Sequence, residues 1–369
     1  MSQQIDKPCF SLPWVEKYRP ENLTDIISHK EILITLTNLI SNNKIPHMIF
    51  YGPPGTGKTT TILACAKKIY GPNYRSMILE LNGSDDRGIN VVREQIKNFS
   101  ATDSKISNIL INNNNNDDDL NDFDNEIVNK EKSTNIKIVI LDEADAMTYD
   151  AQFALRRVVE SYTDSTRFCL ICNYYTKIIP ALQSRCQMFR FAPINHVDHY
   201  NKVKYIVEKE NINIEDDSID KIIELSDGDM RKSLNLLQSL FMITSKKNLK
   251  NTNIKIDNNL VYRTIGYPSD EDREIIINSL NNKTLSETYD TLKTISSDKN
   301  LSNQDIIKEL TIYYVKKSIN DKEKFKLKEK KRFLNFLDEL GKIEQNIASN
   351  THNNIHLLAI SSVINNNKG

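Results

Sequence analysis

The chain has 369 residues, 39% of them hydrophobic and 27% charged, so it is too long for one typical domain and two or three are expected. It has no run of 18 apolar residues and no apolar segment near its first residue, which argues against a membrane span and a secretory signal. Positive and negative side chains balance at 49 each. Six acidic residues gather within Asp117–Glu126, so the rest carries about +6, which fits weak contact with a polyanion.

The first predicted strand leads into a phosphate-binding motif. A helical pattern covers Lys30–Ile40, and the short apolar run Ile45–Tyr51, with Met48–Tyr51 as its core, then predicts a buried strand. The next eight residues fit G-x-x-x-x-G-K-[ST], and a helical pattern continues through Tyr70. The motif is Gly52-Pro53-Pro54-Gly55-Thr56-Gly57-Lys58-Thr59. Strand, glycine loop and helix are the context that this motif requires, so the chain is expected to bind a nucleoside triphosphate.

Each residue type of the motif serves that chemistry. Glycines let backbone N–H groups between Gly52 and Thr60 turn inward on a polyphosphate, and the start of the helix adds its positive dipole end. Lys58 would reach the β- and γ-phosphates, and the Thr59 hydroxyl would ligate Mg²⁺. The alternative, a chance glycine turn before a helix, does not account for both flanks.

Strand and helix patterns alternate over residues 1–192. Further strands are expected at Met77–Leu81, Ile136–Leu141, Phe168–Cys172 and Met188–Phe191, and further helices at Asn90–Phe99 and Ala151–Tyr162. This predicts an α/β fold with a parallel sheet and helices on both faces, where phosphates lie outside the carboxyl ends of the strands. Residues from about 103 to 134, with five consecutive asparagines and the acidic block, predict a disordered surface insertion or, alternatively, an acidic tether.

Polar residues follow two of these strands. The strand at 136–141 ends in D-E-A-D, whose Asp142 would contact Mg²⁺, usually through water. Glu143 is then placed to polarise an attacking water as general base, which predicts ATPase chemistry. Asp145 is expected to cap the next helix. Asn173 ends the following strand, where it either orients the water beside the γ-phosphate or forms a turn.

The five cysteines predict reduced thiols of an intracellular protein, because their number is odd and they are scattered through apolar segments. Cys169 and Cys172 lie three residues apart in a predicted strand. They should therefore point to opposite faces and share neither a metal nor a disulfide. His352 and His356 have helical spacing without a carboxylate or cysteine partner, so no metal is expected there either.

Arg185 lies between Ser184 and Cys186 in a turn between apolar segments. The short hydroxyl and the small thiol on either side are expected to fix the arginine side chain so that it can be presented to a partner. Arginines supplied in trans stabilise the charge of the phosphoryl-transfer transition state. Arg185 is therefore expected to act catalytically on a neighbouring subunit's nucleotide.

After Pro193 the strand patterns stop. Helical patterns at His196–Asn211, Ser218–Ser226 and Asp229–Thr244 predict a helical lid over residues 193–252. Arg231 begins the third helix, where its guanidinium either clamps a phosphate from the lid side or is a solvated charge. A polar linker is expected at Lys246–Asn259. Residues 253–369 predict an all-helical domain, with patterns at Asp270–Asn281, Leu285–Ser296, Asn303–Asn320, Lys328–Gln345 and Ile355–Ile364.

Several of these motifs together resemble one family, the small subunits of replication factor C. This is the eukaryotic sliding-clamp loader of the AAA+ ATPase class. The resemblance covers the first 240 residues except the insertion, and it is weaker in the helical C-terminal third. It is carried by Trp14-Val15-Glu16-Lys17-Tyr18-Arg19-Pro20, the phosphate loop, Leu79–Arg93, the D-E-A-D sequence, Asn173, Ser184–Cys186 and Gly228–Arg231.

The resemblance implies an ATPase that uses ATP and Mg²⁺ in an assembled complex. Family members form a heteropentameric arc joined by a collar of C-terminal helices, here residues 253–369. ATP at the subunit interfaces favours an arc that opens the ring-shaped sliding clamp and grips primer–template DNA, and hydrolysis releases the loaded clamp. The resemblance therefore implies a role in DNA replication and repair in the nucleus.

Four positions receive a role from the resemblance. Val15 and Arg19 match positions that contact the base and phosphate side of the nucleotide. Arg87 and Arg93 match the helix region that lines the DNA channel; the alternative is that they are surface charges without a role. Arginine contacts with phosphates give affinity without sequence readout. The insertion departs from the family, whose members have a short basic segment near the clamp-facing side, so direct clamp contact by this subunit stays open.

Two other functions compete with this hypothesis. A nonhydrolytic structural subunit of a clamp-loader-like AAA+ complex would tolerate a degraded site, and the intact set of motif residues argues against it. A DEAD-box helicase shares the D-E-A-D letters, but a second RecA-like domain is absent from the pattern. An AAA+ clamp-loader ATPase accounts for more of the sequence than either.

Overall fold

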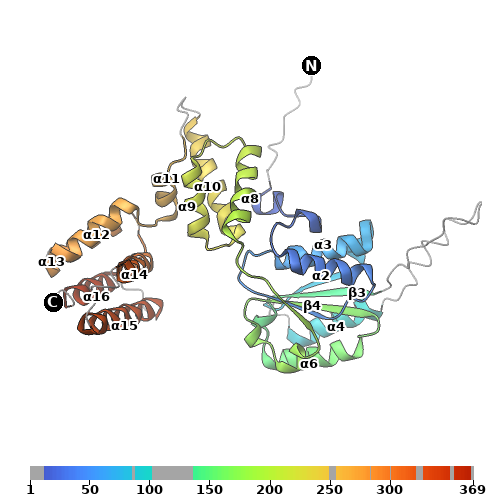
Figure 1. The fold of residues 1–369 in the computed structure, drawn as a ribbon. Coiled ribbons are helices and arrows are strands. Elements are labelled where there is room, and N and C mark those ends of the chain that lie inside the picture. Colours follow the sequence, from blue (N-terminus) through green and yellow to red (C-terminus); the bar gives the residue numbers. More distant parts are fainter. Residues whose placement is uncertain are drawn as a thin grey trace, which may run out of the picture. The chain divides into compact units, whose positions relative to one another are not determined.

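The computed structural model describes residues 12–84, 88–101, 136–248, 255–282, 284–299, 301–320, 327–349 and 353–366 (Figure 1). The chain divides into two compact units, one of Met1–Asn211 with Ile223–Asn235, the other of Ile212–Ile222 with Leu236–Gly369. The predicted insertion and Arg87 lie outside the described residues. The predicted domain boundaries at 192/193 and 252/253 stay predictions. None of the helices described combines the length and apolarity that crossing a bilayer requires.

The first unit is built on a parallel five-stranded sheet in the order β2-β3-β4-β1-β5. Its strands are β1 (Met48–Tyr51), β2 (Ile78–Asn82), β3 (Lys137–Asp142), β4 (Thr166–Cys172) and β5 (Gln187–Arg190). All five lie within one residue or two of the predicted positions, so the predicted α/β sheet is confirmed. Tyr51 of β1 pairs with Cys172 of β4, and Asp142 of β3 pairs with Asn82 of β2. The carboxyl ends of these strands therefore meet at one edge.

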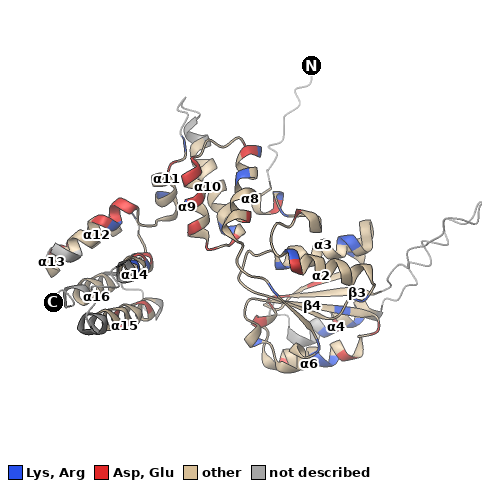
Figure 2. Ribbon diagram, in the orientation of Figure 1, with Lys and Arg blue, Asp and Glu red and all other residues tan. Residues whose placement is uncertain are grey.

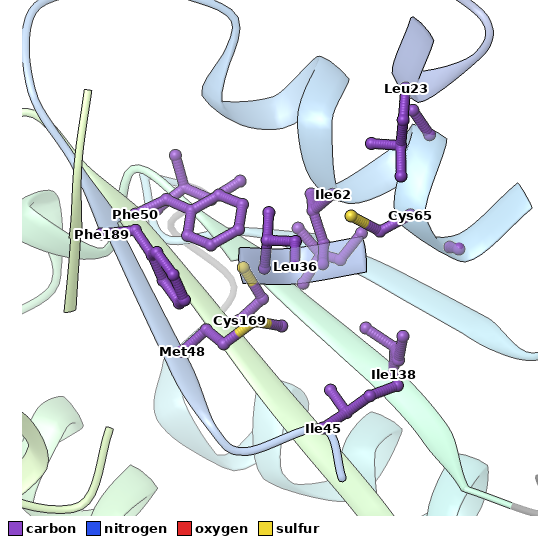
Figure 3. Packing of buried hydrophobic residues seen from close by; sticks show 14 of the residues in the cluster. Leu23, Leu36, Ile45, Met48, Phe50, Ile62, Cys65, Ile138, Cys169 and Phe189 are labelled. Carbon is purple, nitrogen blue, oxygen red and sulfur yellow. The ribbon is translucent and has the colours of Figure 1, made fainter. Parts of the chain in front are cut away.

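Two buried clusters cover the two faces of this sheet, because successive strand residues point to opposite sides. Figure 1 shows α2 (Lys30–Ser41) and α3 (Lys58–Tyr70) on one side and α4 (Gly88–Ala101) and α6 (Tyr149–Ser161) on the other. On the α2–α3 side, Figure 3 shows side chains of both helices packed against three strands. These are Leu36, Ile62 and Cys65 from the helices, and Met48, Phe50, Ile138 and Cys169 from the strands.

The second face buries the intervening strand residues, among them Val139, Phe168 and Cys172, against α4 and α6. Cys169 belongs to the first cluster and Cys172 to the second, and both are at most 1% exposed. The prediction that these two thiols point to opposite faces is therefore confirmed. Full burial of an apolar side chain of this size stabilises a fold by about 1.5–3 kcal/mol, so the sheet edge is held on a rigid base.

Among the described residues, six short elements and the helix α8 complete the first unit. They are α1 (Trp14–Lys17), η1 (Leu23–Asp25), η2 (Gly71–Ser76), η3 (Ala144–Ala146), η4 (Tyr175–Lys177), α7 (Pro180–Gln183) and α8 (His196–Lys209). The helices α9 (Asp216–Ser226) and α10 (Met230–Asn248) each contribute residues to both units. Asn195 caps α8, since its side chain accepts a hydrogen bond from the N–H of Asp198 at 2.8 Å.

The second unit is helical in all its described residues outside the short links. Its remaining helices are α11 (Asn258–Ile265), α12 (Asp270–Asn282), α13 (Leu285–Lys299), α14 (Asn303–Asn320), α15 (Leu327–Ser349) and α16 (Asn353–Asn366). One cluster that includes Leu292, Leu310, Leu340 and Ile360 forms its core. The predicted helical C-terminal part is confirmed, but α11 was not predicted. Its first two residues and the Asp257 cap that starts it lie inside the predicted polar linker.

Candidate nucleotide-binding site

The phosphate loop joins β1 to α3 in a conformation that only glycine adopts without strain. Gly52, Gly55 and Gly57 have φ of 144°, 68° and 93°. At Gly52 a Cβ would also lie 2.0 Å from the carbonyl oxygen of Phe191. Gly57 immediately precedes α3, whose first N–H groups have no partner within the helix. The loop and the helix start therefore form an anion-binding concavity.

Lys58 is buried, and its ammonium is held by three acceptors. Its Nζ donates to the carbonyl oxygens of Gly52 and Pro53, both at 2.7 Å, and to Asn173 Oδ1 at 3.1 Å. An ammonium has three donors, so each has a partner. Burial lowers the pKa of Lys58, and the neighbouring Asp142 partly opposes this shift. The contact with Asn173 links the loop to the end of β4, as predicted for two parts of one site.

Thr59 and Asp142 lie together as the predicted metal ligands should. The Thr59 hydroxyl donates to Asp142 Oδ2 at 2.8 Å, while Asp142 Oδ1 accepts the N–H of Glu143 at 2.9 Å. Among the described residues no cluster of three or more His, Cys, Asp or Glu could hold a metal by itself. One hydroxyl and one carboxylate fit Mg²⁺, which keeps several waters and also binds phosphate oxygens.

Glu143 and Asp145 leave β3 in different directions. Glu143 is exposed, lines the pocket and has φ of 53°, a left-handed conformation that is uncommon for a side-chain-bearing residue. Asp145 Oδ2 accepts the N–H groups of Asn173 and Tyr174 at 3.3 and 3.2 Å. The prediction that Asp145 caps the next helix is wrong, because Thr148 caps α6. Asp145 instead fastens the end of β4 beside the end of β3.

These elements enclose a pocket of about 260 Å³. Most residues predicted to bind nucleotide line it: Val15, Arg19, Pro54, Gly55, Thr56, Gly57, Lys58, Thr59, Thr60, Asp142, Glu143, Asn173 and Arg231. Gly52 and Pro53 do not line it and act through their carbonyl bonds to Lys58. Further lining residues were not predicted from the sequence, among them Tyr18, Ile26, Ile27, Ser28, Ile194, Lys202, Met230 and Leu234. These residues form a largely apolar end of the pocket, which suits the base of a nucleotide. In the sequence only the neighbouring W-V-E-K-Y-R-P segment pointed to this end.

The N-terminal segment is fastened over the apolar end of the pocket. Lys17 Nζ lies 2.5 Å from Glu210 Oε1 at the end of α8, and the Tyr18 hydroxyl donates to the same oxygen. Burial and then this bond to Glu210 raise the pKa of Tyr18. Arg19 is half-buried and paired with Glu16 at 3.1 Å. Val15 and Arg19 therefore reach the pocket from a held segment.

Arg185 lies outside this pocket, as expected for a group that acts on another subunit. Its side chain is 37% exposed and lies 2.5 Å from Glu160 of α6, and it donates to the carbonyl oxygen of Ala181 at 3.0 Å. The expectation that its neighbours Ser184 and Cys186 hold it is wrong. Ser184 instead donates to the Ala181 carbonyl, and Glu160 holds the guanidinium.

Arg93 lies on the exposed surface of α4. With Lys97 of α4 and Arg157 of α6 it lines a surface cavity of about 500 Å³, in which Glu94 is the acidic lining residue. Figure 2 shows Lys and Arg positions on both helices. This cavity and the nucleotide pocket share no lining residue. Its charge suits an anionic partner.

A parallel sheet whose phosphate loop meets an Asp-Glu pair, a polar residue at the next strand end and a helical lid defines a P-loop ATPase of the AAA+ class. A family model described as "ATPase family associated with various cellular activities (AAA)" matches residues 48–194. The model "RCF1/5-like, AAA+ ATPase lid domain" matches 201–242, and "Replication factor C C-terminal domain" matches 268–363.

Relatives extend the likeness over most of the chain. "Replication factor C subunit 3" of Schizosaccharomyces pombe is 45% identical, over 83% of this chain and 80% of that protein. "Replication factor C subunit 5" of Arabidopsis thaliana is 44% identical over 95% and 86%, and that of Homo sapiens 43% over 82% and 79%. The chain belongs to the replication factor C family. Residues 177–186, K-I-I-P-A-L-Q-S-R-C, most resemble the small subunit numbered five in animals and three in budding yeast, and these three relatives bear the numbers 3 and 5.

Proposed function

We propose that this AAA+ ATPase is a clamp-loader subunit that binds and hydrolyses ATP with Mg²⁺ in a heteropentamer. In this role it would open a ring-shaped sliding clamp and load it on primer–template DNA, in replication and repair in the nucleus. The observation that carries the proposal is one pocket lined by Lys58, Thr59, Asp142, Glu143, Asn173 and Arg231. Each of these side chains can serve one function that phosphoryl transfer requires.

The chemistry divides among these residues by charge and position. Thr59 and Asp142 would hold Mg²⁺, which neutralises phosphate charge when bound. Lys58 would contact the β- and γ-phosphates, and Asn173 would orient the attacking water. Glu143 is exposed at the pocket wall. It would accept the proton of the water while the water oxygen attacks the γ-phosphorus and ADP leaves. Arg231 would add positive charge from the lid side.

Association with other replication factor C subunits follows from the family and its C-terminal domain. We infer that the helices of the second unit supply the collar contacts. The in-trans role of Arg185 is supported by its position outside its own subunit's pocket and by its exposure. ATP hydrolysis at a given site would then depend on the neighbouring subunit, which makes turnover a property of the complex.

Contact with DNA is supported by the cationic cavity between α4 and α6. Arg93, Lys97 and Arg157 present three positive charges around it. Phosphate contacts of this kind give affinity for any sequence, as loading at random primer ends requires. Arg87, also proposed for the DNA channel, lies outside the described residues. Contact with the clamp is proposed from the family alone.

The alternative function is a nonhydrolytic structural subunit. In such a subunit the pocket would bind ATP without hydrolysing it, or would bind no nucleotide. The Thr59–Asp142 hydrogen bond and the exposed Glu143 carboxylate favour a hydrolytic site instead.

The test is Glu143→Gln in the reconstituted pentamer, with the exposed Glu31→Gln as control. Glutamine cannot accept a proton, so ATP should still bind while single-turnover hydrolysis at this site falls by roughly 10²–10⁴-fold. Clamp loading on primed DNA should slow in parallel. Near-normal hydrolysis at the site with Glu143→Gln would remove Glu143 as the base. Absence of hydrolysis at this site in the wild-type pentamer would favour the nonhydrolytic alternative.

A further inference from the structure

At the start of α10, one carboxylate lies against the phosphate loop. Asp229 is 9% exposed, and its Oδ1 accepts the N–H groups of Arg231 at 2.8 Å and Lys232 at 3.3 Å. The same oxygen lies 1.7 Å from where a Cβ on Gly55 would be. The carboxylate therefore occupies the space beside Gly55 that a side chain would fill in any other residue. The N–H of Met230 also donates to the Gly55 carbonyl, at 3.3 Å.

The residue before Asp229 is held from a second direction. Gly228 has φ of 78°, and a Cβ there would lie 2.8 Å from Pro193 Cβ. Its carbonyl oxygen accepts the N–H of Ile194 at 3.3 Å. The chain entering α10 is thus fixed both by the phosphate loop and by the segment that enters the lid. The contacts of its neighbours thus fix the backbone from which the Arg231 side chain leaves α10.

We propose that Asp229 is a positioning residue that couples the phosphate loop to Arg231. It does not line the pocket, so it acts through Arg231, which does. When a triphosphate shifts Gly55, the Gly55–Asp229 contact moves the first turn of α10 and aims Arg231 at the γ-phosphate. The lid thereby distinguishes ATP from ADP. This inference rests on the proposed nucleotide site.

A simple helix-capping role makes a different prediction. Serine and asparagine cap a helix about as well as aspartate. Serine keeps a capping oxygen but lacks the outer carboxylate oxygen that lies nearest Gly55, whereas asparagine keeps both the cap and the shape. Asp229→Ser therefore separates the capping function from contact with the loop.

The test measures the Kd of a nonhydrolysable ATP analogue and of ADP for the reconstituted pentamer, by fluorescence at this subunit's site. Asp229→Ala and Asp229→Ser should each raise the Kd of the ATP analogue roughly tenfold, a coupling typical of contacting residues. The Kd of ADP should change by less than about twofold. Asp229→Asn should stay near wild type, as should the exposed control Lys232→Ala. In an Arg231→Ala background, Asp229→Ala should cause no further loss.

Thermal unfolding of the same variants separates positioning from folding. Asp229→Ser should unfold close to wild type while losing ATP discrimination. Wild-type affinity in Asp229→Ser, or additive losses in the double variant, would overturn the inference and leave Asp229 a cap. An Arg231→Ala variant with unchanged affinity would overturn it as well. If the wild-type subunit binds neither nucleotide, the proposed function itself fails, which is a distinct result.

Discussion

Gly52 combines two constraints, a positive φ and a lack of space for a Cβ, of which Gly71 has only the first. Its φ of 144° is outside the range that other residues favour, and a Cβ would collide with the Phe191 carbonyl at 2.0 Å. Gly71 has a positive φ of 58°, but a Cβ there would meet nothing within 4 Å. The pair therefore separates the cost of backbone strain from the cost of a collision.

Replacing each glycine by alanine should destabilise the protein to different degrees. Gly71→Ala is expected to cost about 1–3 kcal/mol from strain alone. Gly52→Ala should cost about 1–3 kcal/mol more, because β5 must move away from the loop. Urea unfolding at pH 7 measures both free energies. Equal losses would show that the loop yields without displacing β5.

The contact made by Asp145 is one that could not be predicted from the local sequence. The spacing within D-E-A-D suits a helix cap, and a local rule assigned it one. The parallel register of β3 and β4 instead brings the N–H groups of Asn173 and Tyr174 to its carboxylate. Only the folded sheet creates that proximity. The sequence predicted Thr59 and Asp142 correctly as neighbours, because the phosphate loop and Asp142 each follow or end a strand of the predicted parallel sheet and so lie at its carboxyl edge.

At the scale of elements, α6 and the turn after α7 share one carboxylate. Glu160 binds Arg156 of its own helix at 3.0 Å and Arg185 at 2.5 Å. Its hydrogen bond with Arg156, and then the charge of Arg185, lower the pKa of Glu160. Exposed pairs contribute little free energy, so a phosphate on a neighbouring subunit can replace Glu160 at small cost.

Arg185→Ala should leave this subunit's own ATP affinity nearly intact and lower hydrolysis at the adjoining site. Loss of an arginine supplied in trans typically costs about 10³-fold or more in rate. Arg156→Ala, which removes the other cation on Glu160, is the matched control and should change hydrolysis little. Single-turnover assays in pentamers with one active site measure both. An isolated subunit whose vigorous ATPase depends on Arg185 would contradict the in-trans role.

A buried histidine joins β1 to β4. His47 is 8% exposed, and its Nδ1 accepts the N–H of Phe168 at 3.2 Å. Burial, and then the charge of Arg167, lower the pKa of His47 from 6.5 to about 4. The folded state therefore holds this imidazole neutral where the unfolded chain would protonate it. Burial lowers the pKa of His29 and His199 in the same direction.

The protein should consequently lose stability as the pH falls from about 6.5 towards 4, since the unfolded state then binds more protons. A pKa that differs by one between the folded and unfolded states changes the free energy of unfolding by about 1.4 kcal/mol. His47→Asn keeps an acceptor for the Phe168 N–H but cannot titrate, so its stability should depend less on pH in this window. Urea unfolding at several pH values compares it with wild type and with His196→Asn on α8. Parallel curves for wild type and His47→Asn would remove His47 from the acid response.

For the whole molecule, charge is distributed so that a nearly neutral chain can still bind an anion. Arg93, Lys97 and Arg157 surround one cavity, while six acidic residues gather in the segment 117–126. Net charge alone therefore says little about partners. The arrangement of α4 beside α6 creates the cationic cavity, and no spacing in the sequence encodes that juxtaposition.

Replacing Arg93, Lys97 and Arg157 together by alanine should weaken primer–template binding by the pentamer at all sequences alike. Each lost phosphate contact should reduce the slope of log K against log salt by about 0.9 on duplex DNA. Nucleotide binding without DNA should not change. The measurement is a salt titration, with the exposed Lys44→Ala as control. Identical slopes for wild type and the triple variant would place these cations outside the DNA path.

Deleting residues 106–133 should leave folding and nucleotide binding close to wild type. The segment is too polar to contribute a core, and loop length changes closure entropy by only about 0.6 kcal/mol per doubling. Melting temperature and binding of an ATP analogue test this prediction. A large fall in melting temperature would show that the segment packs against the domain.

The parallel sheet, the two helical regions and the polyphosphate end of the site could be predicted, because periodicity and a spaced motif encode them. Most of the end that suits the nucleotide base could not, since there the resemblance pointed only to Val15. Ile26, Ile27 and Tyr18 have the composition of ordinary core residues, and only the segment from Trp14 to Pro20, fastened to Glu210, turns them into pocket walls. Contacts between residues about 190 positions apart leave no local pattern.

The buried thiols provide a reporter for opening of the sheet. Burial raises the pKa of Cys65 and Cys172 to about 12, so almost no reactive thiolate is present at neutral pH. A thiol reagent can then modify these residues only during local or global opening. With Cys9 replaced by serine, the labelling rate of Cys172, next to Asn173 at the pocket, would measure how strongly a bound nucleotide closes the first unit. Ligand binding could thus be followed in the assembled complex without a label on the nucleotide.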